Sequence, residues 1–291
     1  MIKKKLIKNA RKIDQFLIKF LKKQQSSLLV KPMKYGVISG GKKIRSTIIF
    51  DAGKIFNISE KKLINICAAV ECIHSYSLIH DDLPCMDNDT IRRGKPATHI
   101  KFGEASAVLA GSSLLTLAFE IIADKKYLLN PKAKNEIIKF LSSCSGHTGI
   151  AGGQELDLKF ENKKKGINQI IDMQKKKTGK LFNFCLYAVG VVAKKNTKDK
   201  LFLSNLGEEI GLLFQLADDF LDFRGLKKLL GKPVKKDHKK GKSTLLNLMG
   251  EKKAYLFANN LKRKILRKLE KHGKNAKELI NTIDFILERK F

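Results

Sequence analysis

Two long apolar stretches decide the fold: LINICAAVECIHSYSLIH at residues 63–80 and LSNLGEEIGLLFQLADDFLDF at residues 203–223. In both, apolar side chains recur every three or four residues, which is the spacing of one face of an α-helix. Segments that alternate polar and apolar residues, as a half-buried strand does, are scarce in the rest of the chain. The sequence therefore predicts an all-α protein.

Glycine and proline divide the remaining sequence into about ten helical pieces. No long Gly/Ser linker separates two halves, so we expect a single domain spanning residues 1–291. The breaks fall at Ser39-Gly40-Gly41, Pro84, Arg93-Gly94-Lys95-Pro96, Asn130-Pro131, Gly152-Gly153 and Gly231-Lys232-Pro233.

Composition indicates a globular protein of a reducing compartment. The chain has 291 residues, of which 43% are hydrophobic, enough to bury a sizeable core. Its five cysteines are odd in number and form no CxxC pair, which argues against a disulfide framework and favours the cytoplasm. The longest near-apolar stretch, residues 181–193, is shorter than the roughly 20 residues of a spanning helix. We expect no membrane span.

The formal net charge of +31 raises nucleic acid or a membrane surface as a partner. The lysines are dispersed along the whole chain without aromatic interleaving, however, so we expect no nucleic-acid partner. The basic amphipathic segment at residues 1–23 could be a transit peptide or a membrane-surface helix. The helical spacing of Ile13, Phe16, Leu17 and Phe20, together with Asp14, favours a first helix of the bundle.

The first carboxylate cluster is DDLPCMD at residues 81–87, which contains Asp81, Asp82 and Asp87. Asp81 and Asp82 follow His74 on one face of a predicted helix. Pro84 interrupts this helix, so we expect Asp87 to lie on a looped end that folds back toward the first pair. The three carboxylates are then expected to converge.

The second cluster is DDFLD at residues 218–222, where Asp218, Asp219 and Asp222 share a helical stripe with Gln215. Like charges in one stripe repel one another unless a cation neutralises them, and carboxylate oxygens suit magnesium that also binds substrate phosphates. A single Asp-Asp pair is typical of a solvated helix surface. Two such clusters among apolar residues indicate instead a metal site that binds a diphosphate.

Basic residues accompany both clusters. Lys42 and Arg45 in GGKKIR share a face if the segment is helical after its glycines, and Arg92 and Arg93 follow the first cluster. The guanidinium fork can hold a diphosphate through paired hydrogen bonds. The other candidates are Lys177 and Thr178 in KKKTGKLF, and Lys232 and Lys242 in GKPVKKDHKKGKST.

The order GGKKIR, ECIHSYSLIHDDLPCMDNDTIRRG, GGQELDL, KTGKLF, FQLADDFLDF and GKST resembles that of the trans-prenyl diphosphate synthases over nearly the whole chain. Within this family, the chain resembles the bacterial farnesyl diphosphate synthases, because its first motif has the spacing DDxxxxD and an aromatic residue, Tyr76, stands five positions before it. The resemblance implies one bundle of helices around a central cavity, and a homodimer. It also implies a magnesium-dependent condensation of isopentenyl diphosphate with dimethylallyl or geranyl diphosphate to farnesyl diphosphate, with three magnesium ions per site.

The same resemblance assigns the site residues. Isopentenyl diphosphate is assigned to Lys42, Arg45, His74 and Arg93, and the allylic diphosphate to Arg92, Lys177, Thr178, Gln215, Lys232 and Lys242. Magnesium is assigned to Asp81, Asp87 and Asp218, with Asp82 and Asp222 binding directly or through water. Lys177, Thr178 and Gln215 are the catalytic candidates, while Tyr76 and Ser77 are expected to limit product length.

Several alternatives stay open. The product could be geranyl or geranylgeranyl diphosphate, and the chain could be a terpene cyclase, a weak subunit of a heteromeric synthase or a non-enzymatic basic surface protein. His74 could be a core histidine and Tyr76 a packing residue. Two positions depart from the family pattern, since Thr90 and Ser112 stand where aspartate is usual. Neither is a predicted metal ligand.

Overall fold

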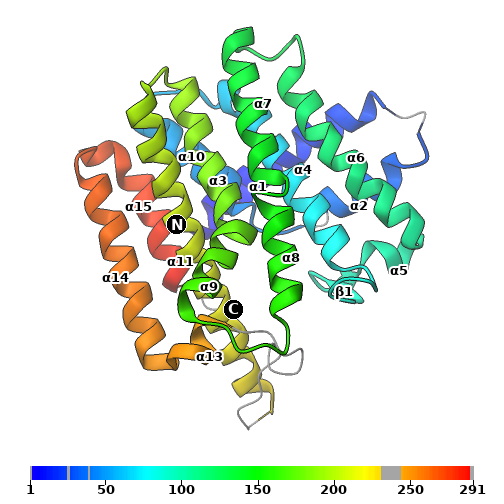
Figure 1. Cartoon of the computed structure of the whole chain (residues 1–291). Helices are drawn as coiled ribbons and strands as arrows, with labels where there is room; N and C mark the ends of the chain where they lie inside the picture. The colour runs from blue at the N-terminus through cyan, green and yellow to red at the C-terminus, as the bar shows by residue number, and fades with distance from the viewer. Residues whose placement is uncertain (1, 25–26, 39, 231–243, 289–291) are drawn as a thin grey trace. The chain divides into compact units, whose positions relative to one another are not determined.

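The structure is a computed structural model, which describes residues 2–24, 27–38, 40–230 and 244–288. It is 79% helical, with about ten long helices, so the all-α prediction is confirmed (Figure 1). Among the described residues the strands are limited to β1 (Ile91–Arg92) and β2 (Lys95–Pro96). They pair antiparallel with Ile91 opposite Pro96, and this hairpin follows the first aspartate motif.

The contacts within the chain divide it into two compact units. Unit 1 comprises Met1–Lys139 and Val191–Lys194, and unit 2 comprises Phe140–Gly190 and Lys195–Phe291. The single domain expected from the sequence stays a prediction. Two helices cross the boundary in sequence, α7 (Pro131–Ser145) and α10 (Lys180–Val192).

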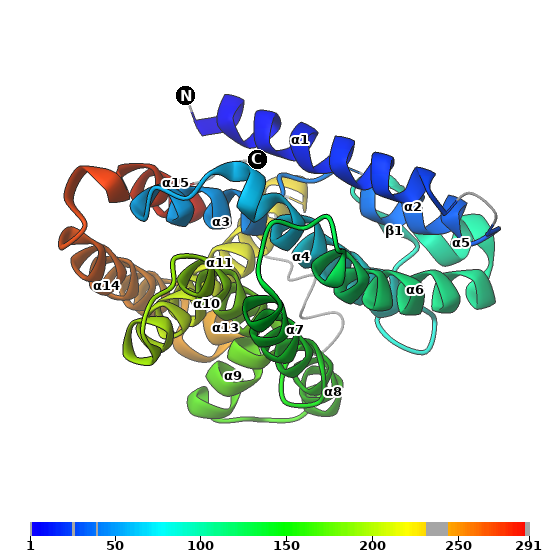
Figure 2. The same ribbon diagram turned by 90° about the horizontal axis from the view of Figure 1, so that it is seen from above.

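Unit 1 is organised around α4 (Glu60–Asp81), the helix that carries the first long apolar stretch. It packs against α1, α2, α3 and α6, and Figure 2 shows α1 extending along this group of helices. Burial on several sides explains why α4 is apolar around most of its circumference. The bounds of these helices are α1 (Ile2–Lys22), α2 (Val30–Ile38), α3 (Ile44–Ile55) and α6 (Glu104–Ala123), and the short α5 (Thr98–Phe102) contacts α2 and α6.

The N-terminal helix α1 uses its apolar face for packing within unit 1. Its buried side chains include Leu6, Ile13, Leu17, Phe20 and Leu21, and it contacts α2, α3 and α4. The prediction that this segment is the first helix of the bundle, with its apolar face packed inside, is therefore confirmed. Most lysines of α1 are exposed, as expected for an amphipathic surface helix, whereas Lys5 pairs with the buried Asp51 of α3 at 2.8 Å.

Helices α4 and α6 are long and apolar enough to cross a membrane by length and composition alone. The most apolar window of α4 is 72% buried, as in the core helix of a globular protein, whereas that of α6 is 44% buried. On its buried side α6 presents Ala107, Ala110 and Gly111, whose small size lets two helices approach closely. The absence of a membrane span stays a prediction.

Unit 2 is organised around α11 (Thr197–Leu230), the helix that carries the second apolar stretch. It contacts α13, α14, α15 and a π-helical turn, η1 (Lys175–Gly179), while α8 also packs against η1. The fully buried Phe182 and Phe184 of α10 lie in the core of this unit. The other elements are α8 (Ile150–Phe160), α9 (Ile167–Gln174), α13 (Leu245–Met249), α14 (Glu251–Glu270), η2 (Gly273–Ala276) and α15 (Lys277–Glu288).

Candidate active site

The first aspartate motif closes α4 with a turn that folds back on the helix. The helix ends at Asp81, and the backbone N–H of Asp87 donates to the Asp81 carbonyl at 2.8 Å. The N–H of Asp89 donates in the same way to the Asp82 carbonyl at 3.1 Å. Pro84 cannot continue the helix, so the chain turns here. The looped return expected for Asp87 is confirmed.

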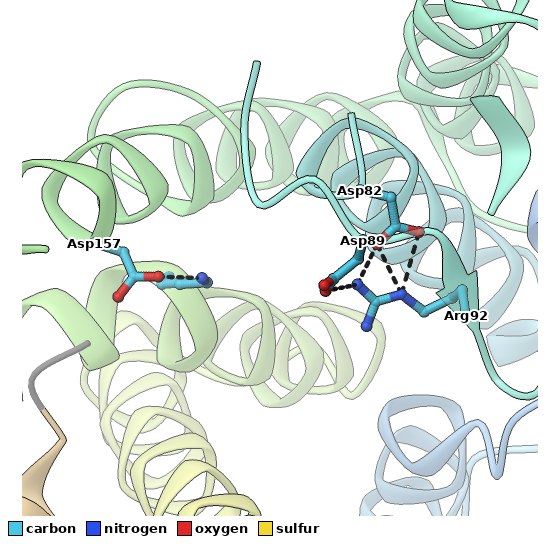
Figure 3. A network of polar contacts seen from close by, with 5 residues as sticks. Asp82, Asp89, Arg92 and Asp157 are labelled. Carbon is cyan, nitrogen blue, oxygen red and sulfur yellow. Dashed lines mark hydrogen bonds and ion pairs between the residues drawn. The ribbon is translucent and has the colours of Figure 1, made fainter. Parts of the chain in front are cut away.

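The side chain of Asp82 is directed to Arg92 of β1 (Figure 3). The Arg92 Nε donates to Asp82 Oδ1 at 2.9 Å, and Nη2 of the same guanidinium donates to Asp82 and to Asp89, the latter at 3.4 Å. Burial raises the pKa of Asp82, and the Arg92 hydrogen bond and charge oppose this effect. Asp82 is thus a buried carboxylate paired with a cation.

The expectation that Asp81, Asp82 and Asp87 converge is wrong. Within the part of the chain that the structure describes, no three His, Cys, Asp or Glu side chains lie close enough to hold a metal ion. Adjacent carboxylates repel one another, and Asp82 relieves this repulsion by pairing with Arg92. Asp81 and Asp87 are half-buried and so keep partial access to solvent.

Four basic side chains act electrostatically on His74 of α4. Burial lowers the pKa of His74 well below its usual value, and the charges of Arg45, Arg93, Lys43 and Arg92 lower it further. An imidazole in this environment is neutral at pH 7. Two of the other predicted residues, Arg45 and Arg93, thus lie near enough to His74 in unit 1 for their charges to affect its pKa.

The start of α3 differs from the expectation for GGKKIR. The helix begins at Ile44, and Lys43 before it has left-handed backbone angles, with φ at 43° and ψ at 51°. Lys42 therefore precedes the helix and does not share a helical face with Arg45. The reason is local, because Gly40 and Gly41 both have φ at 95°, outside the helical region.

Arg93 lies directly against this glycine pair. Its Nη1 donates to the Gly40 carbonyl at 2.7 Å, and its own φ of 54° is positive. A Cβ added to Gly41 would lie 2.7 Å from the Arg93 Cζ, whereas a Cβ added to Gly40 would meet no atom within 4 Å. The guanidinium therefore occupies space that only glycine leaves open at position 41.

In unit 2, a π-helical turn carries two of the predicted catalytic residues. The turn η1 contains Lys177 and Thr178 between α9 and α10, and π-helical turns are frequent at functional sites. Glycines let α8 and α11 pack closely against this turn. A Cβ at Gly153 of α8 would lie 2.1 Å from the backbone nitrogen of Lys177, and a Cβ at Gly211 of α11 would lie 2.6 Å from the Gly179 Cα.

A chain of hydrogen bonds joins η1 to α11. Thr178 Oγ1 donates to Gln215 Oε1 at 2.8 Å, and Gln215 Nε2 donates to Asp219 Oδ1 at 3.0 Å. Gln174 Nε2 donates to Asp219 Oδ2 at 3.1 Å. Asp219 is 5% exposed and accepts one amide on each oxygen. Asp218 is half-buried and Asp222 is exposed, so adjacent aspartates differ in environment.

Lys177 forms an ion pair with Asp157 of α8 at 2.6 Å (Figure 3, where Asp157 is labelled). Asp157 was not among the predicted site residues, although it lies in the GGQELDL motif, which is the signal that could have identified it. Gln174 was also missed, and Asp219 was named in the second cluster but was given no role of its own. No sequence signal identifies Gln174, since its role depends on a partner 45 residues away.

The two predicted chain-length residues lie one turn before Asp81. Tyr76 is 8% exposed, and both burial and the nearby Asp81 carboxylate raise its pKa. Ser77 is half-buried, and its hydroxyl donates to the His74 carbonyl at 3.0 Å. Lys232 and Lys242 lie outside the described residues. The roles of all these residues stay predictions.

Comparison with known proteins places this geometry in a family. The chain matches the model of the Polyprenyl synthetase family over residues 26–283. It is 39% identical to the farnesyl diphosphate synthase of Escherichia coli over 270 residues, which cover 91% of this chain and 90% of that protein.

Two solved structures have the same fold. The FPP/GFPP synthase from Zymomonas mobilis is 35% identical, with a TM-score of 0.85 over 97% of this chain and 99% of that one. The geranyltransferase from Helicobacter pylori, whose structure is a complex with magnesium and isoprenyl diphosphate, is 30% identical, with a TM-score of 0.80 over 98% and 96%. With a family model that matches most of its length and relatives at these identities, the chain belongs to the polyprenyl synthetase family.

Proposed function

We propose that this chain is a magnesium-dependent short-chain trans-prenyltransferase, which joins isopentenyl diphosphate to dimethylallyl and then geranyl diphosphate and releases farnesyl diphosphate. The observation that carries this proposal is the set of cations around His74. Their charges are close enough to help hold the imidazole neutral, which indicates a local positive potential. Such a potential favours a compact polyanion, and diphosphate is the polyanion that fits this family.

In unit 1 the isopentenyl diphosphate is bound by Lys42, Arg45, His74 and Arg93. The two guanidinium groups supply paired charge-assisted hydrogen bonds, and the neutral imidazole supplies a single N–H. Arg93 is already held in place by the Gly40 carbonyl at 2.7 Å. Preorganisation of this kind reduces the entropy lost when the substrate binds.

The carboxylates available in each unit fit magnesium. Asp81 and Asp87 in unit 1 and Asp218 in unit 2 are half-buried, and Asp222 is exposed. Magnesium is commonly bound by one or two carboxylates and completes its shell with water and substrate phosphates, so three converging side chains are not required. These residues would hold the metal, three ions in all, with Asp82 acting through water. When bound, magnesium stabilises the negative charge of the departing diphosphate.

The resemblance assigns the allylic diphosphate to Arg92 of unit 1 and to Lys177, Thr178 and Gln215 of unit 2, and also to Lys232 and Lys242, which lie outside the described residues. Its carbon–oxygen bond breaks and leaves an allylic cation. The double bond of isopentenyl diphosphate then attacks this cation to form the new carbon–carbon bond. The released diphosphate accepts the proton that is lost, so the reaction balances without a dedicated protein base.

Thr178 and Gln215 stabilise the cation with their oxygens, and the hydrogen-bond chain of unit 2 explains their orientation. A carboxylate such as Asp219 only accepts hydrogen bonds, so the Gln215 amide must direct its NH2 group to Asp219. Its carbonyl oxygen then faces Thr178, at 2.8 Å. The Lys177 ammonium is likewise fixed by Asp157. Asp157, Asp219 and Gln174 are positioning residues in this proposal.

Two further features of the proposal are a homodimer and a cytoplasmic location. The exposed side of α6 carries Val108 and Leu109, which are 42% and 53% exposed, and Ile100 of α5 is 53% exposed. Exposed apolar side chains along one helix are typical of an interface with another protein copy.

The cytoplasm is supported by the five cysteines, all described by the structure and all free of disulfides.

The activity and its metal requirement form the first prediction. Purified protein with magnesium, labelled isopentenyl diphosphate and geranyl diphosphate should give a fifteen-carbon product, and EDTA should stop the reaction reversibly. Asp81→Ala and Asp218→Ala should each reduce kcat by roughly 100-fold or more, because a lost metal ligand acts in the transition state. Circular dichroism should show an unchanged helical fold. Normal specific activity in either variant would remove that aspartate from the metal site.

The Arg93 contact generates a prediction with a matched control. Gly41→Ala should displace the Arg93 guanidinium and raise the KM for isopentenyl diphosphate about tenfold, as loss of a charge-assisted contact does. Gly40→Ala introduces the same backbone strain, since both glycines have φ at 95°, but meets no atom of Arg93. It should raise the KM much less. Equal effects of the two substitutions would show that strain, and not Arg93, limits binding.

Product length depends on Tyr76 in this proposal. Tyr76→Ala should open space beside Asp81 and shift the product from fifteen toward twenty or more carbons with a modest loss of rate. Tyr76→Phe keeps the ring and should still give fifteen carbons. Chromatography of the dephosphorylated products measures both. An unchanged fifteen-carbon product from Tyr76→Ala would place the limit to chain growth elsewhere.

The homodimer is tested on α6. Sedimentation equilibrium of the native protein should give twice the chain mass of 32.8 kDa. Leu109→Glu should shift the equilibrium toward the monomer, because a charge would be buried at the interface. Leu201→Glu, at an equally exposed leucine of α11 (52%), is the matched control and should leave the dimer intact. A native monomer at micromolar concentration would contradict the proposal.

A further inference from the structure

The ring of Tyr76 is in contact with a second ring that the site described above does not use. Tyr76 and His80 lie four residues apart on α4, and therefore on the same helix face. Their ring centroids are 5.6 Å apart and the planes meet at 84°, a T-shaped contact. This is a preferred arrangement for aromatic pairs. His80 thus bounds the space into which the Tyr76 ring could rotate.

His80 is in turn anchored to the neighbouring helix of unit 1. Its Nε2 lies 3.0 Å from the backbone carbonyl oxygen of Val108 on α6. A carbonyl oxygen can only accept, so Nε2 carries the hydrogen and donates it. One edge of the imidazole is therefore fixed to α6 while the ring itself contacts Tyr76.

Gly111 provides the space that this arrangement needs. It lies one turn after Val108 on the buried side of α6. A Cβ added to Gly111 would lie 2.3 Å from His80 Nε2 and 2.5 Å from Cδ2, both far inside van der Waals contact. Any side chain larger than hydrogen at position 111 would therefore displace the imidazole and break its hydrogen bond to Val108.

We propose that His80 is a positioning residue for product length, which holds the Tyr76 ring in place from an anchor formed by the Val108 carbonyl and the Gly111 notch. The inference rests on the proposed role of Tyr76 as the limit to chain growth. An aromatic side chain has few rotatable bonds, so a contact on one side of the ring is enough to bias its orientation. Without His80, the Tyr76 ring samples other rotamers and longer products form.

The test compares product ratios among variants of the full chain. His80→Ala should raise the ratio of twenty-carbon to fifteen-carbon product by roughly 2- to 13-fold, the factor that corresponds to loss of one aromatic pair. Gly111→Ala should have the same effect without changing His80 itself. Ser112→Ala, at the next and exposed position of α6, should leave the ratio unchanged. His80→Gln keeps a donor and His80→Phe keeps a ring, so each should restore part of the native ratio.

Two further measurements separate this role from general damage and from an effect on Asp81. The KM for isopentenyl diphosphate and the magnesium concentration for half-maximal rate should stay unchanged in His80→Ala. In the Tyr76→Ala background, His80→Ala should add no further lengthening, because His80 acts through the tyrosine ring. Additive lengthening in the double variant would overturn the proposal.

The outcomes distinguish this inference from the proposed role of Tyr76. If Tyr76→Ala lengthens the product while His80→Ala and Gly111→Ala both keep the native ratio, the positioning role is wrong and the role of Tyr76 stands. If Tyr76→Ala leaves the product at fifteen carbons, the role of Tyr76 is wrong and the inference fails with it. Gly111→Ala, which should have the same effect and leaves His80 itself unchanged, provides the result should His80→Ala fold poorly.

Discussion

The repulsion between neighbouring carboxylates is the constraint on which the candidate site depends. Successive residues of a helix are turned about 100° from each other, so two adjacent aspartates cannot share one environment. In each motif the second aspartate is buried and hydrogen-bonded, Asp82 by Arg92 and Asp219 by Gln215 and Gln174. The first aspartate, Asp81 or Asp218, stays half-buried. The second aspartate of each pair is thus held by hydrogen bonds within the fold, and the first keeps access to solvent and, in our proposal, binds the metal directly.

The second constraint on the site is the close packing of other groups against glycine residues. Gly41 leaves room for the Arg93 guanidinium, Gly153 for the backbone at Lys177, and Gly111 for the His80 ring. In each case a single added carbon would collide with the group that the glycine accommodates. A residue other than glycine would therefore shift the group beside it, which at Gly41 and Gly111 is a side chain that, in our proposals, takes part in binding or specificity.

Hydrogen-bonding chemistry then fixes orientations that sterics alone would leave open. Asp219 accepts from both Gln215 and Gln174, which determines how the Gln215 amide is turned toward Thr178. The Val108 carbonyl likewise determines the orientation of the His80 imidazole, by accepting from its Nε2. In both places an acceptor without hydrogens selects the donor edge of its partner. The side chain that each arrangement orients is the next one in contact, which is Thr178 for Gln215 and Tyr76 for His80.

The sequence by itself determined the helical class, the two aspartate motifs, the looped return of Asp87 and the family, because helical spacing, a proline and ordered motifs are local properties of the chain. Lys42 and Arg45 were expected to share a face if GGKKIR is helical after its glycines. The helix instead begins at Ile44, because the positive φ angles of Gly40, Gly41 and Lys43 are not encoded in hydrophobic spacing.

Only the tertiary structure decided which aspartate of each pair is buried, and which partners hold Lys177, Thr178 and His80. Those partners lie 20, 37 and 28 residues away along the chain. The choice among them depends on packing between helices and on the cost of burying a charge without a counterpart, which no local pattern records.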